Sequence, residues 1–177
     1  MHNAIVSRKD WLQARVALMA KEKALTRVRD QLSAEQRALP WFRIEKDYVF
    51  DGPAGTVTLA ELFDGRSQLV ISHFMMPPGA AHQCVGCSLG VDQLEGILPH
   101  LEAHDLTIVV VARAPIAEIE AVRRRMGWGC RWVSSYHSDF NYDFNVSFTP
   151  GQIAAGTGMV EGNGRFHLTA CGCAKPG

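Results

Sequence analysis

Strand-like and helix-like segments alternate through the middle of this chain. Gln68–Phe74 and Leu106–Ala112 are mostly apolar runs, typical of strands buried on both faces of a sheet, and Arg131–Ser134 is a shorter strand-like segment. Helical spacing of apolar residues lies between these segments, over residues 89–101 and 116–126. This alternation predicts an α/β fold with a central, mostly parallel sheet that is flanked by helices and joined by right-handed crossovers.

Two further strand signals flank the central part. Tyr48–Phe50 and Thr56–Leu59 are short segments separated by the turn residues Asp51–Gly55, so they predict a hairpin. Farther along, Glu161–Gly164 is a turn signal. The alternating apolar residues that follow it predict an edge strand beginning at about Arg165.

The first 40 residues differ in character from the rest of the chain. They hold eight Lys and Arg residues against four Asp and Glu residues, whereas the whole chain has 18 of each sign. Apolar residues recur in this segment at helical spacings, and Ser7 or Asp10 can cap a helix, which predicts one or two helices packed on the main body. We therefore expect a helical extension over residues 1–40 and a main domain over 41–177, within a single compact unit, with the basic helix face solvated.

The composition excludes several classes of partner. Apolar residues make up 47% of the chain and charged residues 20%, as in an ordinary globular domain. Because the net charge is zero, we expect no binding to nucleic acid or to an anionic membrane. The longest apolar run is too short to span a bilayer, and the first residues lack the apolar core of a signal peptide. A cytoplasmic protein is therefore expected.

The chemical signal in the sequence is a Cys-x-x-Cys motif, Cys84-Val85-Gly86-Cys87, between the strand Gln68–Phe74 and the next helix. Unpaired N–H groups at a helix N-terminus favour an anion, so they lower the pKa of a thiol in the first turn. We predict that Cys84 is a nucleophile and that Cys87, one turn further on, resolves the mixed disulfide. Because the motif contains no charged residue, we expect a moderately reducing couple.

Other interpretations of the five cysteines remain open at this stage. An odd number argues against a framework of structural disulfides. A metal site could instead draw soft ligands from His82, from the Cys84 and Cys87 pair, and from Cys171 and Cys173. The thiols could also be inert and buried, in a non-catalytic binding module. Cys171 and Cys173 could form a second exchanging dithiol or lie on an exposed end, and Cys130 is expected in the core.

Several motifs in order along the chain resemble a known family. They are Pro40–Trp41, Glu45–Pro53, Leu62–Leu69, His73–Met75, Arg124–Trp128, Trp132–Ser135 and Ser138–Phe144, and the resemblance extends from about Asp10 to Pro150. On these residues the chain resembles the bacterial predicted dithiol-disulfide oxidoreductases, domain-of-unknown-function family number 899. The resemblance implies a thioredoxin-like fold with an N-terminal helical extension, in which Cys84 and Cys87 match the family's Cys-x-x-Cys.

A thiol–disulfide oxidoreductase is the function that the motif and the resemblance together predict. Such a protein needs no bound cofactor or metal, and its partner would be a thiol or disulfide in a protein or a small thiol. A homodimer is compatible with the sequence. Two departures from related thioredoxin-like proteins stand out: no proline directly precedes the strand at Arg165, and Ala81 replaces the threonine that peroxiredoxins have three residues before their cysteine. Peroxide reduction is therefore not expected.

Some other polar residues also invite a functional interpretation. Asp139, Asn141, Tyr142 and Asp143 lie on a predicted loop, where they could line a cleft near Cys84 or serve only to form a turn. His73 lies inside an apolar strand and is expected to be a core histidine.

Overall fold

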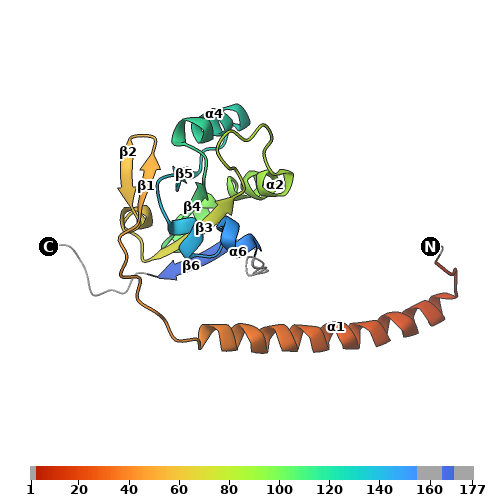
Figure 1. Cartoon of the computed structure of the whole chain (residues 1–177). Coiled ribbons are helices and arrows are strands. Elements are labelled where there is room, and N and C mark those ends of the chain that lie inside the picture. Colours follow the sequence, from red (N-terminus) through yellow and green to blue (C-terminus); the bar gives the residue numbers. More distant parts are fainter. Residues whose placement is uncertain (1–2, 155–164, 170–177) are drawn as a thin grey trace. The chain divides into compact units, whose positions relative to one another are not determined.

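Six strands form one mixed sheet in this computed structural model, which describes residues 3–154 and 165–169 (Figure 1). The strands are β1 (Val49–Gly52), β2 (Gly55–Thr58), β3 (Gln68–Phe74), β4 (Leu106–Ala112), β5 (Arg131–Ser134) and β6 (Arg165–Thr169). Their order across the sheet is β2-β1-β5-β4-β3-β6. The α/β fold expected from the sequence, a central sheet flanked by helices, is confirmed.

The sheet is parallel at its centre and antiparallel at its edges. β3 and β4 run parallel, with Gln68 opposite Leu106, and β4 and β5 also run parallel. β1 is antiparallel to both β2 and β5, and β6 is antiparallel to β3. The centre of the sheet is parallel, as predicted, and β1 and β2 form the predicted antiparallel hairpin. A turn as short as the one between β1 and β2 can join only antiparallel strands, because a parallel connection needs a crossover of a dozen or more residues.

Helices precede these strands in the chain or lie between them in sequence. They are α1 (Arg8–Arg37), the short 3-10 helix η1 (Glu61–Phe63), α2 (Val85–Leu94), α3 (Leu98–Ala103), α4 (Ile116–Met126), α5 (Phe140–Asp143) and α6 (Pro150–Ala154). Within residues 3–154 and 165–169, none of them combines the length and the apolar character that crossing a membrane requires.

The helix predicted over residues 89–101 is divided in two. α2 ends at Leu94, and α3 begins at Leu98 with Pro99 in its first turn. Proline is well tolerated there, because its missing N–H would have no partner inside the helix. The kink expected at Pro99 is thus a break between two helices.

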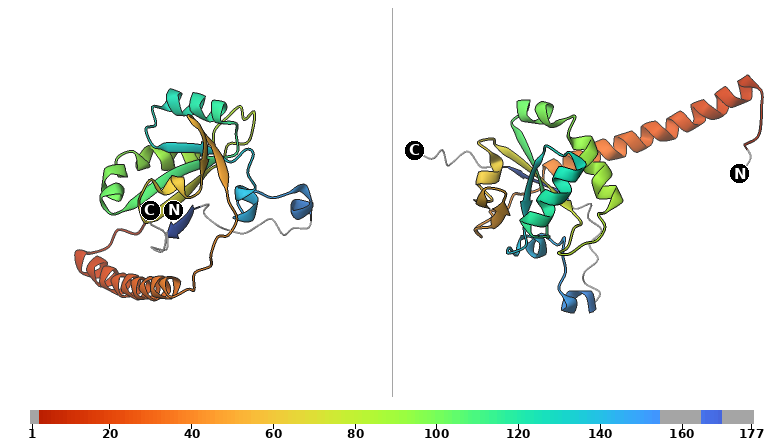
Figure 2. Two further views of the ribbon diagram at one scale, coloured as in Figure 1. Left: turned by 90° about the vertical axis from the view of Figure 1, so that its left-hand side faces the viewer. Right: turned by 90° about the horizontal axis from the view of Figure 1, so that it is seen from above.

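One face of the sheet is covered by α2 and α4 (Figures 1 and 2). Phe74 from β3 and Trp132 from β5 pack there with Val91 from α2 and Ile119 from α4. The rings of Trp128 and Trp132 stack at 5.3 Å, so aromatic groups fill much of this layer. Phe140 belongs to α5 and lies against Phe50 and His73, which places α5 over the opposite face.

The chain divides into two units, Met1–Glu45 and Lys46–Gly177. In the first unit, Ser7 caps α1 as expected, because its hydroxyl accepts a hydrogen bond from the Asp10 backbone N–H at 3.2 Å. One continuous helix follows, with an ion pair of 2.9 Å between Arg15 and Glu22 and no buried residue. The division at residue 40 and the packing of this helix on the main body remain predictions.

Candidate functional site

Cys84 and Cys87 lie where β3 is followed by α2. Cys84 is the N-cap residue of α2, with an extended backbone, and its Sγ accepts a hydrogen bond from the Cys87 backbone N–H at 3.3 Å. A side chain in this position normally satisfies one of the helix's unpaired donors, and here a sulfur atom does so. Both side chains are half-buried, and both are free thiols.

The surroundings of the two thiols shift their pKa values in opposite directions. Hydrogen bonding from the Cys87 thiol, and then from the backbone N–H groups of Cys87 and Gly86, holds the pKa of Cys84 below its ordinary value. Burial is the main cause that raises the pKa of Cys87. The pair therefore favours a thiolate on Cys84 while Cys87 keeps its proton.

Contacts with α4 hold the segment that leads from β3 to Cys84. The Gly79 backbone N–H donates a hydrogen bond of 2.9 Å to the Glu118 carboxylate, and the Arg125 guanidinium donates one to the Gln83 side chain. Met76 anchors the same segment because its side chain is buried in the core. Gly79 has a φ of +68°, which only glycine adopts without strain. These contacts hold the segment before Cys84 in place and so position Cys84 at the N-terminus of α2.

A pocket of about 250 Å³ opens beside the two thiols. It is lined by Ser72, His73, Phe74 and Met75 from the end of β3, and by Cys84, Gly86, Cys87, Gly90 and Val91 from the start of α2. Sequence reasoning did not single out Ser72 or Gly90 for this site. The sequence does contain a signal for this open face of the helix: Gly86 and Gly90, which have no side chains, lie one helical turn apart.

His73 contributes to this pocket as a neutral ring. Burial lowers its pKa to about 4, so the imidazole is uncharged near neutral pH. Its ring also stacks on Phe140, with centroids 5.7 Å apart. His73 therefore lines the pocket from the strand side and supplies no positive charge to the thiols.

The structure gives no support to the metal-site alternative within the described residues. Residues 3–154 and 165–169 contain no group of three His, Cys, Asp or Glu side chains placed to hold a metal ion. Cys171 and Cys173, which that hypothesis needed, lie outside the described residues. Cys130 is a core residue, as predicted, and burial is the main cause that raises its pKa to about 12. A thiol in that state is a poor nucleophile.

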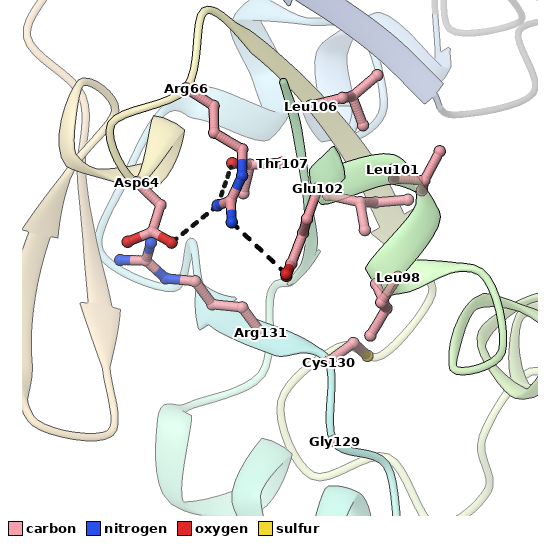
Figure 3. A pocket seen from close by; sticks show the side chains of 11 residues that line it. Asp64, Arg66, Leu98, Leu101, Glu102, Leu106, Thr107, Gly129, Cys130 and Arg131 are labelled. Atoms are coloured by element: carbon pink, nitrogen blue, oxygen red, sulfur yellow. Dashed lines mark hydrogen bonds and ion pairs between the residues drawn. The ribbon is translucent and has the colours of Figure 1, made fainter. Parts of the chain in front are cut away.

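A second pocket, of about 190 Å³, lies between α3 and the first residues of β4 and β5 (Figure 3). Arg66 spans it, pairing with Asp64 at 2.9 Å and with Glu102 at 3.5 Å, and it also donates a hydrogen bond to the Thr107 hydroxyl. Together with Arg131, which also lines the pocket, Arg66 balances the charge of the two carboxylates. The pocket is therefore better explained by structural pairing of α3 with the loop before β3 than by ligand binding.

The polar residues Asp139, Asn141, Tyr142 and Asp143 do not line the pocket at the thiols. Three of them form hydrogen bonds or ion pairs with other segments of the chain. The Tyr48 hydroxyl donates a hydrogen bond of 2.7 Å to Asp143, and Lys46 pairs with both Asp143 and Asp139. Asn141 is buried and accepts a hydrogen bond from the Ser135 hydroxyl at 2.8 Å. Of the two interpretations left open by the sequence, the structural one fits these contacts.

We expect Tyr48→Phe to lower the free energy of unfolding by about 1–2 kcal/mol at neutral pH, because a hydrogen bond to a carboxylate is lost. Hydrogen bonds from Lys46 and Tyr48 hold the pKa of Asp143 below its ordinary value. The ionised Asp143 carboxylate therefore contributes to the free energy of unfolding above its unfolded-state pKa of about 3.9. This contribution is lost as the pH falls through the lower pKa that Asp143 has in the folded protein. Urea unfolding from about pH 7 to about pH 2 should show the difference shrinking.

The half-exposed Tyr136 provides the control for this measurement. Tyr136→Phe should leave stability unchanged within about 0.5 kcal/mol. A Tyr48→Phe effect that stays constant into acid would contradict a bond to the Asp143 carboxylate.

A titration of thiol reactivity tests the hydrogen bonding of Cys84. The alkylation rate of Cys84 by iodoacetamide, followed by mass spectrometry of its peptide, should rise with pH through a midpoint below the ordinary value of about 8.5. In Cys87→Ala the midpoint should move upward, because the thiol donor is lost. It should not reach the ordinary value, since the backbone donors remain. Val85→Ala, at an exposed position between the cysteines, should leave the midpoint in place.

Comparison with known proteins places the chain among bacterial sequences. A family described as bacterial protein of unknown function (DUF899) matches residues 1–172. No curated protein matches the chain.

Solved structures of thioredoxin-fold proteins are similar at low identity. Bacterioferritin comigratory protein of Xanthomonas campestris, described by its alkyl peroxide reduction, is 18% identical over 55% of this chain and 59% of that chain, with a TM-score of 0.45. Peroxiredoxin Q of the same organism is 17% identical over 68% and 72%, with a TM-score of 0.49. PrxQ of Xylella fastidiosa is 18% identical over 64% and 68%, with a TM-score of 0.46.

Proposed function

The chain belongs to the DUF899 family of bacterial proteins of unknown function, and from its own geometry we propose that it is a thiol–disulfide oxidoreductase that uses Cys84 and Cys87. The observation that supports this most directly is that Cys84 caps the start of α2, where its Sγ accepts a hydrogen bond from the backbone N–H of Cys87, the second free thiol, at 3.3 Å. A reactive thiolate beside a protonated partner is the arrangement that disulfide exchange requires.

The proposed reaction has two exchange steps. The Cys84 thiolate attacks one sulfur of a substrate disulfide, forming a mixed disulfide and releasing the other sulfur as a thiolate. Cys87 then loses its proton to water, and its thiolate attacks the Cys84 sulfur. A Cys84–Cys87 disulfide forms and the second substrate thiol leaves. The substrate gains two electrons and the protein loses two.

The residues around the dithiol suit these steps. Backbone N–H groups at the start of α2 stabilise the Cys84 thiolate before attack. The raised pKa of Cys87 keeps it protonated until Cys84 is engaged, so the two thiols do not compete for one substrate. The sulfur atoms of Cys84 and Cys87 supply both electrons, so the proposed reaction requires no bound cofactor.

We propose that the partner is a disulfide or thiol of a protein or a small thiol, in the cytoplasm of a bacterium. The cytoplasm is kept reducing, so a moderately reducing dithiol would be regenerated there by other thiols. In that setting the protein would spend most of its time as the dithiol.

Oxidation of the reduced protein by a disulfide tests the proposal. Pre-reduced protein incubated with bis(2-hydroxyethyl) disulfide should lose two thiols, and peptide mapping should find Cys84 linked to Cys87. A variant with Cys171→Ser and Cys173→Ser should react at the same rate. If the reaction instead needs those two residues, or if Cys84 and Cys87 stay reduced, the proposal fails and a non-catalytic module becomes the better explanation.

A further inference from the structure

Apart from Cys84, whose thiolate charge is lost once its sulfur bonds to a substrate sulfur, the pocket beside the thiols is lined by uncharged groups. Its nine described lining residues include no Lys, Arg, Asp or Glu, and its one imidazole, that of His73, is neutral because burial lowers its pKa to about 4. Phe74, Met75 and Val91 supply apolar surface, and the two cysteine sulfurs face the same space. Once Cys84 is part of the mixed disulfide, a charged group held here would have lost water without gaining an opposite charge from any lining residue, which is costly.

The pocket is also open along the helix that carries the thiols. A Cβ added at Gly86, which lines the pocket, would meet no atom within 4 Å, so a side chain at this position would enter open space beside the motif. The φ of Gly86 is not positive, so the backbone does not require glycine there. The volume of about 250 Å³ exceeds the apolar cavity of about 150 Å³ that holds benzene in an engineered protein.

Exposed apolar side chains continue this surface on the same elements. Met75, Val85 and Leu89 are 66%, 84% and 58% exposed. Val85 and Leu89 are the helix neighbours of the pocket residues Gly86 and Gly90, and Met75 follows β3. Exposed apolar side chains therefore lie next in the chain to residues that line the pocket.

Resting on the proposed function, we propose that the pocket selects the substrate: it receives the uncharged, apolar group that flanks the disulfide attacked by Cys84, and it disfavours disulfides whose flanking groups are charged. The flanking group enters between the end of β3 and the first turns of α2 while the sulfur that bears it bonds to Cys84. It leaves as a thiol when Cys87 resolves the mixed disulfide. The substrate disulfide is the oxidant in this sequence and the dithiol the reductant.

Three symmetric disulfides of similar size test the inference, because each presents the same group on both sulfurs. They are diethyl disulfide, which is neutral, dithiodipropionate, which is anionic, and cystamine, which is cationic. The rate at which each oxidises pre-reduced protein is divided by its rate with 2-mercaptoethanol at the same pH, which removes intrinsic reactivity. After this correction, diethyl disulfide should react at least tenfold faster than either charged disulfide.

Filling the pocket provides the matched comparison. Gly86→Leu should reduce the preference for diethyl disulfide at least fivefold, whereas Gly96→Leu should leave it unchanged, since Gly96 also lies in open space but does not line the pocket. A preference is a ratio of two rates in one variant, so a change in the thiolate fraction of Cys84 cancels. Equal reduction of the preference by both variants would overturn the inference.

The remaining outcomes separate this inference from the proposed function. Equal corrected rates for the three disulfides would overturn the charge selection while leaving the oxidoreductase in place. A preference for either charged disulfide over diethyl disulfide would also overturn it. If none of the disulfides oxidises Cys84 and Cys87, the proposed function itself fails.

Discussion

Replacing Cys84 with Ser should slow the oxidation of the protein by disulfides by at least about a thousandfold, because a hydroxyl does not replace a thiolate as the attacking group. Cys84 is the thiol whose pKa lies below its ordinary value, whereas burial raises the pKa of Cys87. Cys87 alone should therefore react poorly. The rate is measured by quenching with acid, alkylating the remaining thiols and counting them by mass spectrometry.

The variant Cys87→Ser should fail at a different step. Cys84 should still attack the substrate, but the mixed disulfide should accumulate because no thiolate is present to resolve it. Mass spectrometry should find one substrate half attached to Cys84. Cys130→Ala serves as the control, since the Cys130 thiol is buried and its pKa is raised to about 12. If Cys84→Ser reacted at the rate of Cys130→Ala, Cys84 could not be the nucleophile.

Phe140→Ala should lower the free energy of unfolding by about 3–5 kcal/mol, the usual cost of emptying an aromatic core position. Phe140 is fully buried. Its ring lies 5.1 Å from that of Tyr48, 5.0 Å from that of Phe50 and 4.5 Å from that of Phe144, measured between centroids. Replacing the Phe140 ring with a methyl group would remove all three ring contacts at once. Urea unfolding followed by circular dichroism measures the change.

Two comparisons make this stability prediction specific. Phe42→Ala, at a position that is 77% exposed, should change the stability by no more than about 0.5 kcal/mol. Phe140→Leu should lose less than Phe140→Ala because more of the volume stays filled. A loss below about 1 kcal/mol for Phe140→Ala would mean that the layer between α5 and the sheet is not part of the core.

The central elements were predictable because their signals are local. The bounds of β3, β4 and β5 follow from short apolar runs, and α4 follows from apolar residues at helical spacing. The helix after the Cys-x-x-Cys motif was predicted from Leu89, whereas α2 begins at Val85, directly after Cys84. The division between α2 and α3 was misjudged, because apolar spacing continues across Gly96 and Pro99 although the backbone hydrogen bonding does not.

Contacts between distant segments were not visible in the sequence. Lys46 and Asp143 are 97 positions apart, and no pattern in either segment indicates their ion pair. The same holds for the bonds from α4 to the segment before Cys84, made by Glu118 and Arg125. Such pairs depend on how the layers pack, and packing is a property of the assembled chain.

The sequence by itself determined which residues could do chemistry here: two thiols three positions apart, at the start of a helix that follows a buried strand. Only the tertiary structure decided how those thiols differ and what surrounds them. Desolvation of Cys87 and the neutral walls of the pocket arise from side chains of β3 and α2 that meet only after folding. Spacing along a chain can bring two sulfur atoms close, but the water and charge around them depend on every element packed nearby.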